Sequence, residues 1–185
     1  MSGNSTLIIF IAVLLSERAF ELLIARRNEL WILQKGGREI AAGFSKLIVV
    51  FHVGWFAGFL LEGIAGGRQV LTPLPFAVLA LLVLQAARYW CIRSLGPYWN
   101  TKVMILPGAS LHRRGPYKWF RHPNYLVVII EIALYPALFG CFWTAVVGSA
   151  INAFLLKKRM AQEEAALKEH TNYQEIFAKI AYRPN

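Results

Sequence analysis

The side chains best suited to chemistry gather in one short segment, residues 115–125. They belong to Tyr117, Arg121, His122 and Tyr125, with His112 just upstream. Pro116 and Pro123 fix their own φ angles and disfavour helical geometry in the residue that precedes each of them. Gly115 and His122 are therefore expected in a turn or an extended conformation. This fixed cluster of hydrogen-bonding groups indicates a binding site, because a mere lipid-headgroup anchor has no use for rigid turns.

A second polar set lies on the last predicted helix. Asn152, Arg159 and Glu163 are separated by seven and four residues, so they share one helical face, and Glu164 is the next residue round. Arginine before glutamate is the less favourable order for a helical ion pair, which weakens a purely stabilising role. An amphipathic helix lying on a membrane would explain Lys168 but not Asn152, which sits inside an apolar stretch.

Four apolar blocks must position these two sets. Residues 7–24, 47–65 and 74–92 each suit one transmembrane helix, which needs about 20 residues. The fourth block, 126–156, is interrupted by Pro136 and Gly140. It predicts two tightly connected helices, 126–138 and 142–159, the second running on into the cytoplasm.

The fold class predicted is all-α integral membrane, with five transmembrane helices, the last two forming a helical hairpin, and a C-terminal cytoplasmic helix. Residues 1–185 are expected to form a single membrane-embedded domain. Three transmembrane helices fall in residues 1–92, and residues 93–185 carry both polar sets.

Positive charge separates the apolar blocks. Twenty Lys and Arg against ten acidic residues give a formal charge of +10 in a chain that is 57% hydrophobic. The basic residues cluster in 25–46, 93–125 and 157–159, which the positive-inside rule places together in the cytoplasm, with the N-terminus outside. The same placement in short loops argues against nucleic-acid binding and for contact with a lipid bilayer.

Several common enzyme signatures are missing. The sequence has no GxGxxG, P-loop, HExxH or GxSxG motif, so hydride transfer on a Rossmann scaffold, phosphate cleavage and zinc hydrolysis lose support. Cys91 and Cys141 lie inside apolar segments without CxxC spacing. We expect two buried thiols and no metal site.

A weaker polar set lies on the first helix. Glu17, Glu21 and Asn28 share one face, and Arg18 can reach Glu21. Ionisable groups at membrane depth usually face the bundle interior, so internal pairing is the favoured interpretation. A role around a substrate entrance is the alternative.

The two main polar sets together resemble the isoprenylcysteine carboxyl methyltransferase family. The matching residues are Gly115, Tyr117, Arg121, His122, Pro123 and Tyr125, then, after a helical hairpin, Arg159, Glu163, Glu164, Leu167 and Tyr173. Upstream, the string from Glu17 to Asn28 looks like a bacterial branch of that family. The resemblance implies an integral-membrane enzyme, in a bacterial inner membrane, that transfers a methyl group from S-adenosylmethionine.

The resemblance also implies roles for individual residues. The expected cofactor-binding residues are His112, Gly115, Tyr117, Arg121, His122, Pro123, Tyr125, Glu163 and Glu164. The expected catalytic residues are His122, Arg159 and Glu163, and the expected substrate-binding residues are Asn152 and Arg159.

The acceptor implied by the resemblance is lipophilic. It is either an isoprenylcysteine carboxylate, as on a prenylated protein, or the hydroxyl of a long-chain polyketide phenol or pyrone. Two other functions stay open at this point. One is an NADPH-dependent membrane reductase of lipid or sterol double bonds, which has a similar architecture. The other is a non-catalytic membrane scaffold whose basic loops bind anionic lipid.

Overall fold

The computed structural model describes residues 3–66, 73–110 and 113–173 of the chain. Five α-helices dominate it: α1 (Gly3–Gln34), α2 (Ala42–Ala65), α3 (Leu74–Leu95), α4 (Pro123–Leu138) and α5 (Phe142–His170). Two short 3-10 helices, η1 (Gly96–Tyr98) and η2 (Gly115–Lys118), and two strands, β1 (Arg38–Ile40) and β2 (Val103–Ile105), lie between them.

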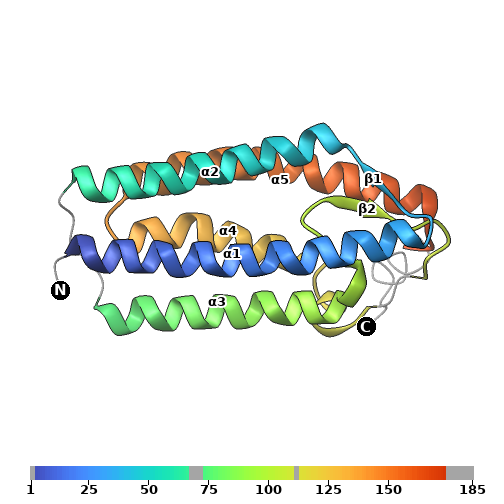
Figure 1. Ribbon diagram of the computed structural model, residues 1–185, viewed down its shortest axis with the longest axis horizontal. Helices are drawn as coiled ribbons and strands as arrows, with labels where there is room; N and C mark the ends of the chain where they lie inside the picture. The colour runs from blue at the N-terminus through green and yellow to red at the C-terminus, as the bar shows by residue number, and fades with distance from the viewer. Residues whose placement is uncertain (1–2, 67–72, 111–112, 174–185) are drawn as a thin grey trace, which may run out of the picture.

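The five helices lie lengthwise beside one another as an elongated bundle (Figure 1). One end of the bundle holds β1, β2 and the end of α5, and the opposite end holds the start of α1 and the α4–α5 turn. The described parts of the basic segments 25–46 and 93–125 lie toward the end that holds β1 and β2, and residues 157–159 lie about midway along α5. We call the end that holds β1 and β2 the basic end.

Two of the helices are long and apolar enough to cross a membrane, α2 and α3, and α4 is a shorter apolar helix. Only 17% of the most apolar part of α2 is buried, so most of its side chains face outward, as expected for a lipid-facing helix. The prediction of an apolar helical bundle is confirmed. Five membrane crossings and the cytoplasmic position of the C-terminus stay predictions.

The structure adds a feature that the all-α prediction did not include. Strands β1 and β2 pair antiparallel, with Arg38 opposite Ile105 and Ile40 opposite Val103. Lys102, just before β2, forms ion pairs with Glu29 of α1 at 2.6 Å and with Glu39 of β1 at 3.3 Å. This two-stranded ribbon joins the α1–α2 connection to the segment after α3, so it forms one wall at the basic end.

Aromatic side chains fill the core near the opposite end. The ring of Phe10 lies 5.4 Å from that of Tyr135 and 4.9 Å from that of Phe139, and Phe59 packs 5.7 Å from Phe139. All four side chains are buried. They bring α1, α2 and α4 together where apolar burial stabilises the bundle.

The predicted hairpin forms between α4 and α5, and Glu62 of α2 secures its second helix. The first residues of α5 lack a local side-chain cap at Cys141. Instead, the Glu62 carboxylate accepts hydrogen bonds from the backbone N–H groups of Trp143, at 3.1 Å, and Thr144, at 2.8 Å. An acidic side chain thus satisfies two N–H groups that a helix start leaves free.

Pro136 lies inside α4 and removes one backbone donor from it. The N–H missing at position 136 would have bonded to the carbonyl of Ile132, four residues earlier. Trp55 of α2 replaces it, because its indole N–H lies 3.3 Å from that carbonyl. A side chain of one helix therefore completes the backbone bonding of another.

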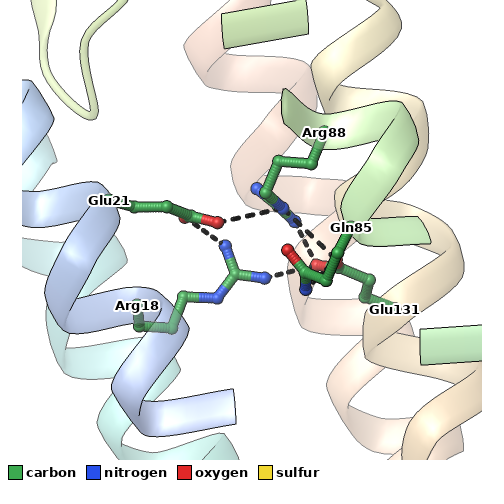
Figure 2. A network of polar contacts seen from close by, with 5 residues as sticks. All are labelled: Arg18, Glu21, Gln85, Arg88 and Glu131. Carbon is green, nitrogen blue, oxygen red and sulfur yellow. Dashed lines mark hydrogen bonds and ion pairs between the residues drawn. The ribbon is translucent and has the colours of Figure 1, made fainter. Parts of the chain in front are cut away.

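A ring of ion pairs crosses the interior of the bundle (Figure 2). Arg18 contacts Glu21 at 2.6 Å and Glu131 at 2.5 Å, and Arg88 contacts Glu21 at 3.3 Å and also Glu131. Gln85 donates a longer hydrogen bond, of 3.4 Å, to Glu131. The predicted Arg18–Glu21 pairing is confirmed, and the ring extends it to α3 and α4.

Candidate active site

An open cavity lies at the basic end and encloses about 1170 Å³ of empty space, its mouth included. Residues from η1, β2, η2, α4 and α5 line it, among them Tyr98, Ile105, Tyr117, Tyr125 and Glu163. Both polar sets found in the sequence reach the same cavity.

The start of α4 presents two side chains to this cavity. His122 immediately precedes the helix in a non-helical conformation, with φ −129° and ψ 60°, as expected for a residue before proline. Pro123 then opens the helix, where its missing N–H costs nothing. The rings of His122 and Tyr125 stack with their centres 5.2 Å apart and their planes 13° apart.

A hydrogen-bonded chain joins α4 to α5 at the cavity wall. The Nε of Arg159 donates to the hydroxyl of Tyr125 at 2.9 Å, and that hydroxyl donates to the carboxylate of Glu163. The guanidinium also lies 5.5 Å from the centre of the Tyr125 ring. The Tyr125 hydroxyl therefore lies between the Arg159 guanidinium and the Glu163 carboxylate, which are one turn apart on α5, and it orients both.

His122 has its own partner on α5. Its Nε2 lies 3.0 Å from an Oε of Glu164. Partial burial would raise the pKa of the Glu164 carboxyl, but the hydrogen bond and charge of His122, followed by a hydrogen bond from Tyr173 and the charge of Arg121, together lower it. The carboxylate form is favoured, and it orients the imidazole beside the cavity.

The η2 turn forms another part of the wall. Gly115 has a φ of +52°, and a Cβ there would overlap the side chain of Ser94 on α3. The guanidinium of Arg113 donates to the backbone carbonyls of Tyr117, at 3.3 Å, and Lys118. Burial raises the pKa of the Tyr117 phenol well above its usual range, so this ring presents an unionised hydroxyl.

Asparagine side chains fix the floor of the cavity to α1. The Asn28 amide donates to the carbonyls of Trp99, at 2.8 Å, and Gly96, at 3.2 Å. In return, the Asn100 amide donates to the carbonyl of Ala25 at 3.0 Å. At the other side, the backbone N–H of Gly108 donates to the carbonyl of His170 at 3.0 Å, which ties the loop after β2 to the end of α5.

The structure distributes the predicted site residues as follows. Six of them line the cavity: Tyr117, Arg121, His122, Tyr125, Arg159 and Glu163. Gly115, Pro123 and Glu164 lie immediately behind the lining and shape or orient it. Asn152 is buried in α5, seven residues before Arg159 and about 10 Å away along the helix axis, and it is not part of the lining. His112 lies outside the described residues.

Two features of the cavity were not predicted. Asn124 lines it, and among the described residues its buried Oδ1 has no hydrogen-bond partner. Its position inside the 115–125 segment was a usable signal. The second feature is the wall formed by β2, including Val103 and Ile105. Such a three-residue strand carries too little pattern to be recognised in a sequence.

Known proteins are similar to this chain over most of its length. The family model of the isoprenylcysteine carboxyl methyltransferase (ICMT) family matches residues 77–169, which include every candidate site residue. An uncharacterized protein of Bacillus subtilis (strain 168), YpbQ, is 37% identical over 163 residues, 88% of this chain and 97% of that protein. An uncharacterized protein of Haemophilus influenzae is 29% identical over 157 residues, 84% of this chain and 91% of its own length. The chain therefore belongs to the ICMT family.

Proposed function

We propose that the protein is an integral-membrane O-methyltransferase that binds S-adenosylmethionine in the cavity at the basic end. The observation that carries the proposal is the pair of contacts joining α4 to α5, Arg159–Tyr125–Glu163 and His122–Glu164, at the wall of one cavity. Membership of a family of membrane methyltransferases gives the class of reaction.

Two polar groups in the cavity wall lack a protein partner of the complementary kind among the described residues, and the proposed ligands could supply one to each. Arg159 is 8% exposed, and among the described residues no carboxylate forms an ion pair with it. A buried cation without a counter-ion is costly, so a ligand that brings an anionic oxygen is favoured here. The free Oδ1 of Asn124 needs the opposite, a donor such as an amino or hydroxyl group. The oxygen of a methyl acceptor would supply the anion for Arg159, and the amino group of S-adenosylmethionine would supply a donor for Asn124.

Different residues of the cavity would bind different parts of S-adenosylmethionine. Glu163 would accept from the amino group or the ribose hydroxyls, and Arg121 or His122 would hold the carboxylate end. The rings of Tyr117 and Tyr125 offer aromatic faces to a positively charged sulfur. When bound, S-adenosylmethionine supplies a methyl group that an oxygen nucleophile can displace from sulfur.

Arg159 would hold the acceptor oxygen. Methyl transfer depends chiefly on an oriented nucleophile in a site that excludes water, and a guanidinium fixed by Tyr125 provides the orientation. An acceptor carboxylate is already ionised at pH 7 and needs no base. A phenol or enol acceptor would have to pass its proton to His122 or to a glutamate. An apolar tail on either acceptor could stay in the bilayer, beside the exposed side chains of the bundle.

Equilibrium binding to the purified protein tests the proposal. Labelled S-adenosylmethionine is expected to bind the unmodified protein, and Glu163→Gln and His122→Ala are expected to lower the affinity at least tenfold, about 1.4 kcal/mol. Glu169→Gln is the matched control, because Glu169 is on the same helix but its side chain is 75% exposed.

Two results would contradict the proposal. The first is no binding of S-adenosylmethionine by the unmodified protein, and saturable binding of NADPH in its place would favour a reductase. The second is full affinity in both Glu163→Gln and His122→Ala, which would remove the assigned site.

A further inference from the structure

The ring of ion pairs in the bundle is centred on Glu131. Glu131 is the one charged residue of α4, and its side chain is 3% exposed. It receives donors from two other helices: Arg18 Nη2 of α1 at 2.5 Å, Arg88 Nε of α3 at 3.2 Å and Gln85 Nε2 of α3 at 3.4 Å. Figure 2 shows these donors converging on the one carboxylate.

The charges within the ring balance. Arg18 and Arg88 each contact both Glu21 and Glu131, so two cations and two anions close on themselves. Buried ionic groups of this kind contribute little net stability, and their best-attested use is to fix the register between elements.

Beyond residue 125, another directional bond fixes the register of α4, the 3.3 Å hydrogen bond from the Trp55 indole of α2 to the Ile132 carbonyl. From Leu126 onward most other side chains of α4 are apolar. Apolar contacts have no preferred direction, so they do not fix how far a helix slides along its neighbours. The hydrogen bonds from α1 and α3 to the Glu131 carboxylate are directional, so they do fix this position. They set both the depth and the rotation of α4 relative to the other helices.

The N-terminal end of the same helix carries the candidate site. Glu131 follows Tyr125 by six residues, a rise of about 9 Å. The Tyr125 hydroxyl must lie between Arg159 and Glu163 of α5 to bond both, so a slide of α4 by even one ångström would break that chain.

We propose that Glu131 is a positioning residue for the cofactor site: held by Arg18 and Arg88, it places the Tyr125 hydroxyl between Arg159 and Glu163. The inference rests on the proposed function, since it assigns to the ring an effect on S-adenosylmethionine binding. Glu131 does not line the cavity at the basic end and touches no cofactor.

A double-mutant cycle tests the inference. The dissociation constant for S-adenosylmethionine is measured for the unmodified full-length protein and for Glu131→Gln, Tyr125→Phe and the combined variant. Glu131→Gln is expected to weaken binding about tenfold. In the Tyr125→Phe background the same change is expected to weaken binding less than about twofold, because the hydroxyl that Glu131 positions is already gone.

Two further variants distinguish a loss of cofactor binding from a loss of folding. Glu62→Gln weakens the cap of α5 at the opposite end of the bundle, so it is expected to lower thermal stability and leave the dissociation constant unchanged. Arg18→Lys keeps the positive charge but removes the guanidinium, whose two Nη atoms contact Glu21 and Glu131. It is expected to weaken binding of S-adenosylmethionine about threefold. It replaces Glu131→Gln in the cycle if that variant does not fold.

The outcomes separate the two proposals. If the unmodified protein does not bind S-adenosylmethionine, the proposed function fails and the inference with it. If it binds and Glu131→Gln binds equally well, only the inference fails. Losses that multiply in the combined variant would also overturn it, because they would show that Glu131 acts independently of Tyr125.

Discussion

Removal of the Glu62 side chain should loosen the α4–α5 hairpin by a predictable amount. The carboxylate accepts from two N–H groups at the start of α5 and from the Thr144 hydroxyl at 2.8 Å. Loss of a capping side chain costs roughly 0.5–2 kcal/mol, and loss of a negative charge at a helix N-terminus costs about 0.3–1 kcal/mol more. We therefore expect Glu62→Ala to lower the free energy of unfolding by about 2 kcal/mol.

Thermal unfolding in detergent, followed by circular dichroism, measures this effect. For a chain of this length about 2 kcal/mol corresponds to a fall in Tm of about 4–8 °C. Glu169→Ala is the matched control, since that exposed carboxylate near the other end of α5 has, among the described residues, one ion pair, with His170 at 3.8 Å. A Tm for Glu62→Ala within about 1 °C of the control would mean that the start of α5 is capped in another way, and the reasoning would fail.

Three further predictions concern the site. Because the folded-state pKa of Glu164 is lowered, its stabilising contribution is present above the ordinary carboxyl range and is lost as the pH falls through the lowered value. Thermal stability should therefore fall less in Glu164→Gln than in the unmodified protein as the pH is lowered from neutral to well below the ordinary carboxyl pKa of about 4.3, and equal slopes would contradict the lowered pKa of Glu164. Gly115→Ala should cost at least about 1–2 kcal/mol, from the left-handed backbone and the overlap with Ser94, and Ser94→Gly should restore only part of it in denaturant titrations. Burial, and next the charge of Glu164, raise the pKa of Tyr173 to about 12, so its contribution to stability is lost as the pH rises above the unfolded value of about 10. Alkaline melting curves should fall less steeply in Tyr173→Phe, and identical curves would contradict the burial of this phenol.

The sequence was sufficient to place the main helices. The predicted blocks 74–92 and 126–138 correspond to Leu74–Leu95 and Pro123–Leu138, because a long, mainly apolar run that begins near a proline has few alternatives. The ends were less predictable. Helix α1 runs from Gly3 to Gln34, well beyond the predicted 7–24, because its polar last turns pack on η1 through Asn28 and not on lipid.

The meeting of the two polar sets also followed from the sequence. A turn before a hairpin and a helical face after it must lie at the same end of the bundle, and the 3.0 Å contact between His122 and Glu164 places them side by side. Their chemical roles do not follow from that placement and stay proposals.

The partners of isolated polar residues could not be read in advance. Arg88 and Glu131 lie inside apolar blocks on different helices, 43 positions apart. The sequence around each residue does not indicate which residue it pairs with. Neither residue was singled out from the sequence, although the cost of an unpaired charge at that depth implies a partner for each. Only the packing of α1, α3 and α4 shows which partner it is.

The exchange between Pro136 and Trp55 has a consequence for anyone altering this chain. Phenylalanine at position 55 would leave the Ile132 carbonyl unpaired as long as position 136 is proline. Alanine at position 136 would restore the helix's own donor and leave the indole N–H as the orphan. Each of these replacements is therefore expected to be harmful alone and tolerated with the other, so libraries that vary single positions would misjudge both sites.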